Sequence, residues 1–312
     1  NMTISFKVSD NTKNKLNEFY EDLKREKTPP YAIFQAQDGD TVVTLYESGK
    51  IVFQGKDADL ASDFWIATEK MNNKFLEVNN SDKKDKKKVD LYIDPKIYNS
   101  TSIGSDEVGT GDYFGPIVVT STYVKKEDIP FLKELGVTDS KKLDDEKIMN
   151  IVPEIIKRIP YSTYILSNEK YNELHSTMNM NKIKAVLHNK VLVELTDKYN
   201  DTDYVVVDEF AKENIYYSYL KEVPNVYRKI TFITKAEIKC LSVACASLIS
   251  RYILIKEFDK LSKNLNLKLL KGASNLVDEQ GAEIVKKYGF DKLREIAKLN
   301  FKNTDKIKNL ID

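Results

Sequence analysis

Residues 103–116 read Ile-Gly-Ser-Asp-Glu-Val-Gly-Thr-Gly-Asp-Tyr-Phe-Gly-Pro, and the interpretation of the whole chain starts from them. Two adjacent acids, Asp106 and Glu107, come directly before a Gly-Thr-Gly turn, and an apolar, β-rich run follows at 117–124. Carboxylate oxygens suit a hard divalent cation, and glycines allow a ligand close to the main chain because no Cβ stands in the way. A site that processes phosphodiesters needs both features. The alternative is a solvated acidic hairpin with a glycine turn.

The composition indicates a globular protein with about two domains. The chain has 312 residues, of which 41% are hydrophobic and 31% charged, and its formal net charge is +1. Bulk charge therefore does not mark a nucleic-acid binder, and any basic surface must come from local clustering. Cys240 and Cys245 lie in one apolar run and are expected to be core residues of a cytoplasmic protein. No stretch is long and apolar enough to span a bilayer.

The first part of the chain, residues 1–78, predicts a small sheet with flanking helices. We expect helices at Asn11–Glu26 and Asp57–Asn73, the second with an apolar stripe at Leu60, Ala61, Phe64, Trp65 and Thr68. We expect strands at Thr3–Val8, Tyr31–Gln37, Thr41–Tyr46 and Lys50–Gln54. This part carries 10 Lys and Arg against 13 Asp and Glu, so electrostatics alone does not make it a nucleic-acid clamp.

Residues 79–97 are expected to be a lysine-rich linker, with Lys83–Lys88 as its densest part. It is either a plain spacer or a basic segment that touches a phosphate backbone. Residues 98–312 then predict a second domain of the α/β class. Hairpin strands are followed by strands interleaved with helices, which is typical of a mixed sheet with helices on its faces. Long helices are expected at Asn179–Tyr199 and Glu237–Leu261.

Two further acids stand at positions typical of a site. Asp208 ends the apolar strand 203–207, and open α/β sheets place their sites at such carboxyl ends. Glu209 competes with Asp208 for this role, and spacing does not separate them. Glu237 opens the last long helix, where it could also complement the helix dipole. A regular strand points Asp106 and Glu107 to opposite faces, so both reach one site only if the strand bends. His175 and His188 have no matching partner motif, and histidine-based nucleophilic chemistry is not expected.

Five motifs together resemble the type 2 ribonucleases H, in that family's order along the chain. They are Asp106–Pro116, Asp139–Leu143, Asn179–Ala185, Val205–Phe210 and Lys235–Glu237. Two features are similar to the ribonuclease HIII group: the turn is Gly-Thr-Gly where the ribonuclease HII group usually has Gly-Arg-Gly, and the last carboxylate is Glu237 where that group has Asp. The segment Gly49–Gly55 resembles the strand-turn pattern of a single TATA-binding-protein-like repeat.

This resemblance implies a ribonuclease H-like fold and a metal-dependent endoribonuclease. Nothing in the sequence suggests an obligate dimer, and we expect a monomer. Its substrate would be an RNA–DNA hybrid, its products would carry 5′-phosphate and 3′-hydroxyl ends, and its first domain would bind the hybrid. Two Mg²⁺ or Mn²⁺ ions would be held by the catalytic residues Asp106, Glu107, Asp208 and Glu237. The turn residues Gly109, Thr110 and Gly111 would contact ribose 2′-hydroxyl groups, and Lys141 and Lys142 would contact phosphates unless they form only a solvated turn. The alternatives are nicking at single ribonucleotides, as in ribonuclease HII, and a catalytically silent hybrid-binding protein.

Overall fold

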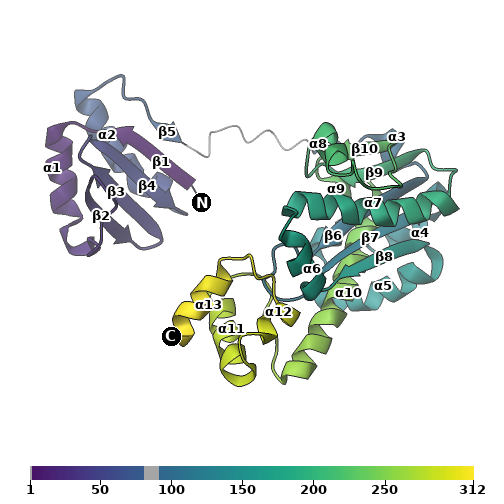
Figure 1. The fold of residues 1–312 in the computed structure, drawn as a ribbon. Coiled ribbons are helices and arrows are strands. Elements are labelled where there is room, and N and C mark those ends of the chain that lie inside the picture. Colours follow the sequence, from purple (N-terminus) through teal and green to yellow (C-terminus); the bar gives the residue numbers. More distant parts are fainter. Residues whose placement is uncertain (1, 81–90) are drawn as a thin grey trace. The chain divides into compact units, whose positions relative to one another are not determined.

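In the computed structural model, which describes residues 2–80 and 91–312, the chain folds as two units (Figure 1). They are Asn1–Asp90 and Leu91–Asp312, here the N-terminal unit and the C-terminal unit. The Lys83–Lys88 run of the expected linker lies outside the described residues. On either side of it, the chain forms the short strand β5 (Asn79–Asn80), which pairs with β1, and the helix α3 (Pro95–Tyr98).

The N-terminal unit is an antiparallel sheet covered by two helices. Its strands follow the order β2-β3-β4-β1-β5, and the expected strands are confirmed. The bounds are β1 (Met2–Lys7), β2 (Ala32–Asp38), β3 (Thr41–Tyr46) and β4 (Lys50–Gly55) for the strands, and α1 (Asp10–Phe19) and α2 (Ala58–Asn72) for the helices. Leu16 of α1 and Trp65 of α2 pack with Phe34 and Ile51 of the sheet. This core is built entirely from residues of the N-terminal unit.

Two expectations for the helices of this unit are wrong. Helix α1 ends at Phe19, not Glu26, because Lys24 and Arg25 instead pair with the edge strand β2. The buried stripe of α2 is Ala58, Ser62, Trp65 and Glu69. Leu60 and Phe64, expected in that stripe, are 71% and 65% exposed. The carboxylate of Glu69 is buried because it accepts hydrogen bonds from the backbone and hydroxyl of Ser9 and from Thr12, a contact between distant segments that periodicity does not reveal.

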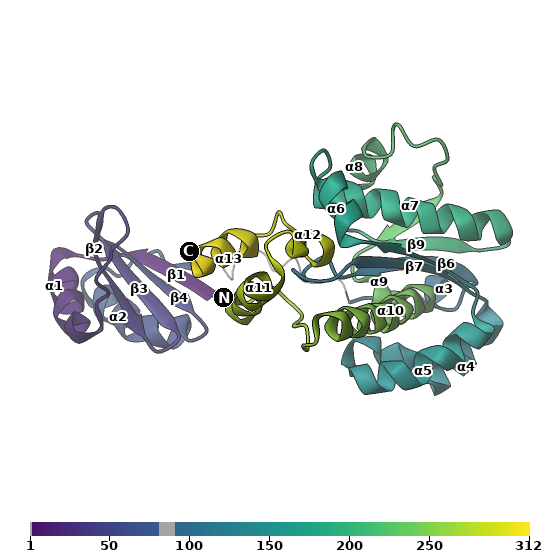
Figure 2. The ribbon, with the colours of Figure 1, turned by 60° about the horizontal axis from the view of Figure 1, so that its bottom comes forward.

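The C-terminal unit is a mixed sheet between two helical layers, as Figure 2 shows. The strand order is β10-β9-β6-β7-β8: β7 pairs antiparallel with β6 and β8, and β9 pairs parallel with β6 and β10. The strands are β6 (Ser102–Val108), β7 (Ile117–Val124), β8 (Tyr161–Leu166), β9 (Tyr204–Asp208) and β10 (Ile230–Ile233). Helices α7 (Met180–Lys198) and α8 (Glu213–Ser218) lie on one face, and α4 (Ile129–Glu134), α5 (Asp145–Arg158) and α10 (Leu241–Leu265) on the other. The predicted mixed α/β fold class is confirmed.

The expected helix Glu237–Leu261 is two helices. The short helix α9 (Ala236–Lys239) stops at Cys240, whose backbone is extended, and α10 begins at Leu241. The first residues of α10 are tied to the sheet: the hydroxyls of Ser242 and Ser102 lie 2.7 Å apart, and Thr122 donates to the carbonyl of Ser242. These contacts with β6 and β7 set the start of α10. Cys240 and Cys245 are buried and form no disulfide.

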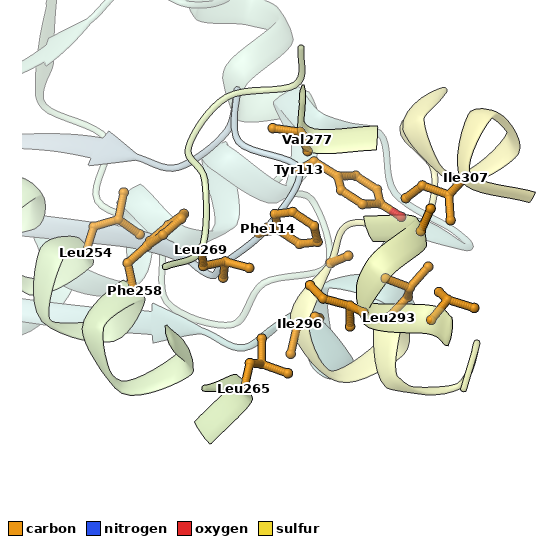
Figure 3. Close-up of a cluster of buried hydrophobic side chains, with 14 of the residues drawn as sticks. Tyr113, Phe114, Leu254, Phe258, Leu265, Leu269, Val277, Leu293, Ile296 and Ile307 are labelled. Carbon is orange, nitrogen blue, oxygen red and sulfur yellow. The ribbon is translucent and has the colours of Figure 1, made fainter. Parts of the chain in front are cut away.

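The C-terminal helices form a layer of their own beside one end of the sheet (Figure 2). They are α11 (Asn275–Tyr288), α12 (Lys292–Ile296) and α13 (Asn303–Ile311). Their apolar side chains surround Tyr113 and Phe114, which follow the Gly-Thr-Gly turn and are fully buried, as Figure 3 shows. The remaining helix, α6 (Asn168–His175), lies next to α12. Among residues 2–80 and 91–312, no helix is both long enough and apolar enough to cross a membrane.

Candidate active site

Three of the predicted site carboxylates line one cavity of about 310 Å³. Asp106 comes from β6, Asp208 from the end of β9 and Glu237 from α9. Because β6 and β9 are parallel neighbours, with Ser105 beside Val207, both strands deliver their acids to the same edge of the sheet. Glu209 lines the cavity too, so the structure, like the sequence, leaves Asp208 and Glu209 as competing ligands.

The loop between β10 and α9 holds Glu237 at this cavity. Lys235 adopts a left-handed backbone conformation (φ 52°, ψ 46°), which turns the chain sharply before α9. The backbone N–H of Ala236, the next residue, then donates to Asp208 Oδ1 at 3.1 Å. The end of β9 and the start of α9 are thereby joined, so Asp208 and Glu237 are positioned together.

The charges around Asp106 are poorly balanced. Burial, followed by the neighbouring charges of Glu107 and Glu237, raises the pKa of Asp106 well above the usual range of a carboxyl. Hydrogen bonds from the Glu107 backbone N–H and the Ser247 side chain offset this only in part. A cluster of carboxylates with too few hydrogen-bond donors favours the binding of a cation.

Glu107, the fourth predicted ligand, faces away from the cavity. Strand β6 keeps a regular register with β7 from Ser102 to Val108, so it does not bend between the two acids. Glu107 therefore points toward α7, where Oε1 lies 2.6 Å from Lys184 Nζ and Oε2 lies 2.7 Å from His188 Nε2. Burial alone would raise the pKa of Glu107, but the hydrogen bond and charge of His188 together with Lys184 outweigh it and lower the pKa to about 2.

Lys184 and His188 are site residues that the sequence reasoning missed. His188 is fully buried, and its Nδ1 lies 2.6 Å from Ser105 Oγ, so its ring bridges two residues of β6. The sequence offered no partner motif for His188, and the structure supplies its partners, Ser105 and Glu107. The signal was present: Lys184 and His188 stand four residues apart on a predicted helix, hence on one face, and alternation along β6 sends Glu107 to one side of the sheet.

The Gly-Thr-Gly turn has an anchored base and an open tip. It is closed by the Asp112 N–H, which donates to the Gly109 carbonyl at 3.3 Å. Gly109 has φ +94°, and a Cβ there would meet the Pro116 carbonyl oxygen at 2.4 Å, so the fold itself requires this glycine. Gly111 is exposed, and a Cβ there would meet nothing within 4 Å. The fold does not require a glycine at position 111. The absence of a side chain there therefore favours close approach of a ligand to the main chain.

The two predicted phosphate-binding lysines lie in the 3₁₀ helix Val137–Lys142 and differ in their contacts. Lys141 pairs with Glu237 at the cavity, whereas the side chain of Lys142 is 83% exposed and lies 3.6 Å from Asp139. Arg251 of α10 donates to the carbonyls of Ser140 and Leu143, which holds this 3₁₀ helix beside the cavity. Lys141 is therefore placed at the candidate site, and Lys142 is a solvated side chain near it.

The donor set at the cavity fits a hard divalent cation. Asp106, Asp208 and Glu237 offer only carboxylate oxygens, the ligands that Mg²⁺ and Mn²⁺ prefer. Burial, and after it the charges of Glu107 and Glu237, raise the pKa of Asp106, and a cation at the cavity would favour its ionised form. Within residues 2–80 and 91–312, no three His, Cys, Asp or Glu side chains are already arranged closely enough to hold a metal ion. The cavity thus supplies suitable ligands without a closed cage.

Family models match nearly the whole chain. Residues 103–304 match the family described as Ribonuclease HII, and residues 3–87 match a family described as a domain of unknown function, DUF3378. The first match includes every residue of the candidate site, and the second spans the sheet and helices of the N-terminal unit.

Similar proteins share both units. Ribonuclease HIII of Bacillus licheniformis is 44% identical over 89% of this chain and 89% of its own length. Ribonuclease HIII of Bacillus subtilis is 41% identical over 98% of this chain and 97% of its own length. A crystal structure of Bst-RNase HIII in complex with Mn²⁺ superposes with a TM-score of 0.69 at 36% identity, covering 99% of both chains. This chain therefore belongs to the ribonuclease HIII group of the ribonuclease HII family, endoribonucleases that cleave the RNA strand of RNA–DNA hybrids.

Proposed function

We propose that Asp106, Asp208 and Glu237 form the catalytic and metal-binding site with which this chain cleaves RNA–DNA hybrids, and that Glu107, which the resemblance adds to this set, acts from the other face of β6. The observation that carries the proposal is the cavity in which acids from β6, β9 and α9 converge. One of these acids, Asp106, lies three residues before the first glycine of the Gly-Thr-Gly turn. When bound there, two Mg²⁺ or Mn²⁺ ions would activate the attacking water and neutralise the leaving 3′ oxygen, which gives 5′-phosphate and 3′-hydroxyl ends. The Mn²⁺ in the structure of Bst-RNase HIII supports a divalent ion.

The chain's own residues would divide the work of binding and orientation. Asp106, Asp208 and Glu237 would hold the cations at the cavity, and Lys141 would exchange its pairing with Glu237 for a phosphate once the cations are present. Glu107 enters the set through the family resemblance, and the pair Lys184 and His188 holds its carboxylate ionised on the α7 side of β6. Mutual repulsion among the acids would fall on cation binding, because opposite charges favour ionised carboxylates.

The turn would supply the discrimination between RNA and DNA. Its tip at Thr110 and Gly111 is accessible, and main-chain groups there lie within reach of a ligand because no side chain of Gly111 covers them. The 2′-hydroxyl is the group by which a protein distinguishes RNA from DNA. We therefore assign Gly109, Thr110 and Gly111 to ribose contacts.

The N-terminal unit would bind the hybrid through the sheet face opposite its helices. A hollow of about 570 Å³ on this unit is lined in part by Arg25, Gln35, Gln54 and Lys56. Gln35 follows the core residue Phe34, and Gln54 follows the core residue Phe53, so strand alternation places both amides on the outer face. Amides and cations suit phosphate and sugar contacts. We expect the protein to act as a monomer in the cytoplasm.

Cleavage assays test the proposal directly. An end-labelled RNA–DNA hybrid is incubated with Mg²⁺, with Mn²⁺ or with a chelator, beside single-stranded RNA, duplex DNA and a duplex carrying one ribonucleotide. We expect metal-dependent cutting of the RNA strand of the hybrid alone. Cutting at the single ribonucleotide would favour the ribonuclease HII activity instead, and binding without cutting under either metal would favour a silent hybrid-binding protein.

A further inference from the structure

Lys298, which follows α12, is a lysine buried completely inside the protein. Its relative exposure is 0%, and it lies among the C-terminal helices. Its ammonium nitrogen donates to two main-chain carbonyls, those of Asp112 at 2.7 Å and Gly115 at 2.6 Å. Burial lowers the pKa of Lys298 to about 7, and the charge of Asp112 offsets this only in part. Burying a charged amine costs folding free energy unless the amine is hydrogen-bonded, so we ask what the contacts of Lys298 contribute.

Both carbonyls belong to the segment that follows the Gly-Thr-Gly turn. Asp112 closes the turn through its N–H, and Gly115 ends the loop before β7. Lys298 therefore joins the two ends of this segment from the protein interior. An apolar side chain of similar length would remove this donor from the Asp112 carbonyl and one of two side-chain donors from the Gly115 carbonyl, which also accepts from Asn168.

Other contacts hold the same segment but leave the tip untouched. The Gly272 N–H donates to Asp112 Oδ1 at 2.7 Å, and the Lys298 N–H donates to the Tyr113 carbonyl at 2.8 Å. Asn168 donates to the same Gly115 carbonyl at 2.8 Å. The rings of Tyr113 and Phe114 sit in the apolar cluster of the C-terminal helices, as Figure 3 shows. Thr110 is half-buried and Gly111 is exposed, and the contacts named above do not include either residue.

We propose that Lys298 is a positioning residue for ribose recognition, which holds the turn Gly109–Thr110–Gly111 in the orientation that reads the 2′-hydroxyl. This inference rests on the proposed role of the turn. Lys298 itself is buried beneath the loop and does not contact the substrate. The C-terminal helices α11–α13 would then act as the support on which the specificity turn is mounted, since Lys298 lies between α12 and α13 and these helices contribute much of the cluster around Tyr113 and Phe114.

The test compares binding of two ligands of one sequence, an RNA–DNA hybrid and a DNA duplex, to the full chain. Fluorescence anisotropy in the presence of a chelator measures both dissociation constants without cleavage. We expect the wild type to prefer the hybrid, and Lys298→Met to lose about tenfold or more of that preference, the loss expected for one charge-assisted hydrogen bond.

Two matched variants separate positioning from other effects. Lys286→Met removes an exposed lysine charge from α11, and we expect it to keep the preference for the hybrid. Ile284→Ala opens a cavity in the same apolar cluster, so it should lower the unfolding temperature yet keep the preference. If Lys298→Met does not fold, Lys298→Gln replaces it: its amide nitrogen lies one bond closer to the backbone and cannot reach both carbonyls.

The outcomes distinguish this inference from the proposed function. A folded Lys298→Met or Lys298→Gln protein with the wild-type preference would overturn the role of Lys298 alone. Equal affinity of the wild type for hybrid and duplex would contradict the role of the turn, and the positioning role with it. An equal loss of preference in Ile284→Ala would show that Lys298 acts only through general stability.

Discussion

Asp106 is the residue on which the candidate chemistry depends most directly. Burial is the main reason why the pKa of Asp106 is raised, and the neighbouring charges of Glu107 and Glu237 raise it further. We expect Asp106→Asn to lower cleavage of the hybrid by more than the roughly 10–100-fold lost with outer-shell partners of a metal, with hybrid affinity retained. Glu283→Gln, which removes an exposed acid of α11 outside the cavity, is the control and should stay active. Steady-state rates with binding in chelator measure both. Full activity of Asp106→Asn would contradict the site.

Lys298 links the same region to pH. Its pKa is lowered to about 7, against an ordinary value near 10.4. Between these values the unfolded chain holds a proton that the folded chain has lost, so the free energy of unfolding rises with pH, by at most about 1.4 kcal/mol per pH unit. The cost of burying the charged lysine is therefore absent above about pH 10.4, and it destabilises the folded chain fully once the pH has fallen to about 7. Urea unfolding at pH 6.5 to 9 should show the wild type gaining stability relative to Lys298→Met, and parallel curves would refute the shifted pKa.

At the scale of elements, the Gly-Thr-Gly turn offers two glycines with opposite requirements. Gly109→Ala places a Cβ 2.4 Å from the Pro116 carbonyl oxygen at a positive φ, whereas Gly111→Ala has open space. We expect Gly109→Ala to lower the unfolding temperature. Gly111→Ala should keep it but weaken hybrid binding, because a methyl group would stand where the ligand approaches. Calorimetry and anisotropy on both variants check this, and wild-type affinity of Gly111→Ala would contradict a contact at that position.

At the scale of the whole molecule, each unit has its own buried core. The cluster around Leu16 and Trp65 belongs to the N-terminal unit, and the remaining clusters belong to the C-terminal unit. We therefore expect residues 91–312 to fold alone. Removal of residues 1–90 should raise the KM or the dissociation constant for the hybrid far more than it lowers kcat. Unchanged affinity would favour a stabilising or regulatory role for the N-terminal unit, and the comparison needs only the two purified chains.

The sequence by itself determined the fold class, the family and the position of three acids. Local patterns placed Asp106 near the end of β6 and Asp208 at the end of β9, and the parallel pairing of these strands brings both acids to one edge of the sheet. Strand alternation also anticipated that Glu107 would face away unless β6 bent, and β6 does not bend. Motif order along the chain carried the resemblance to the type 2 ribonucleases H, and the Gly-Thr-Gly turn and Glu237 carried the resemblance to the ribonuclease HIII group. Neither depends on a contact between distant residues.

Only the tertiary structure decided which groups surround these acids. Three features depend on contacts between segments far apart in the chain. They are the pairing of Glu107 with Lys184 and His188, the break of the helix at Cys240, and the exposure of Leu60 and Phe64 on α2. Lys298 lies 186 residues from Asp112, and periodicity gives no reason to bury a lysine. Such positions are set by the competition of packing and hydrogen bonding across the whole unit, a balance that local propensity does not contain.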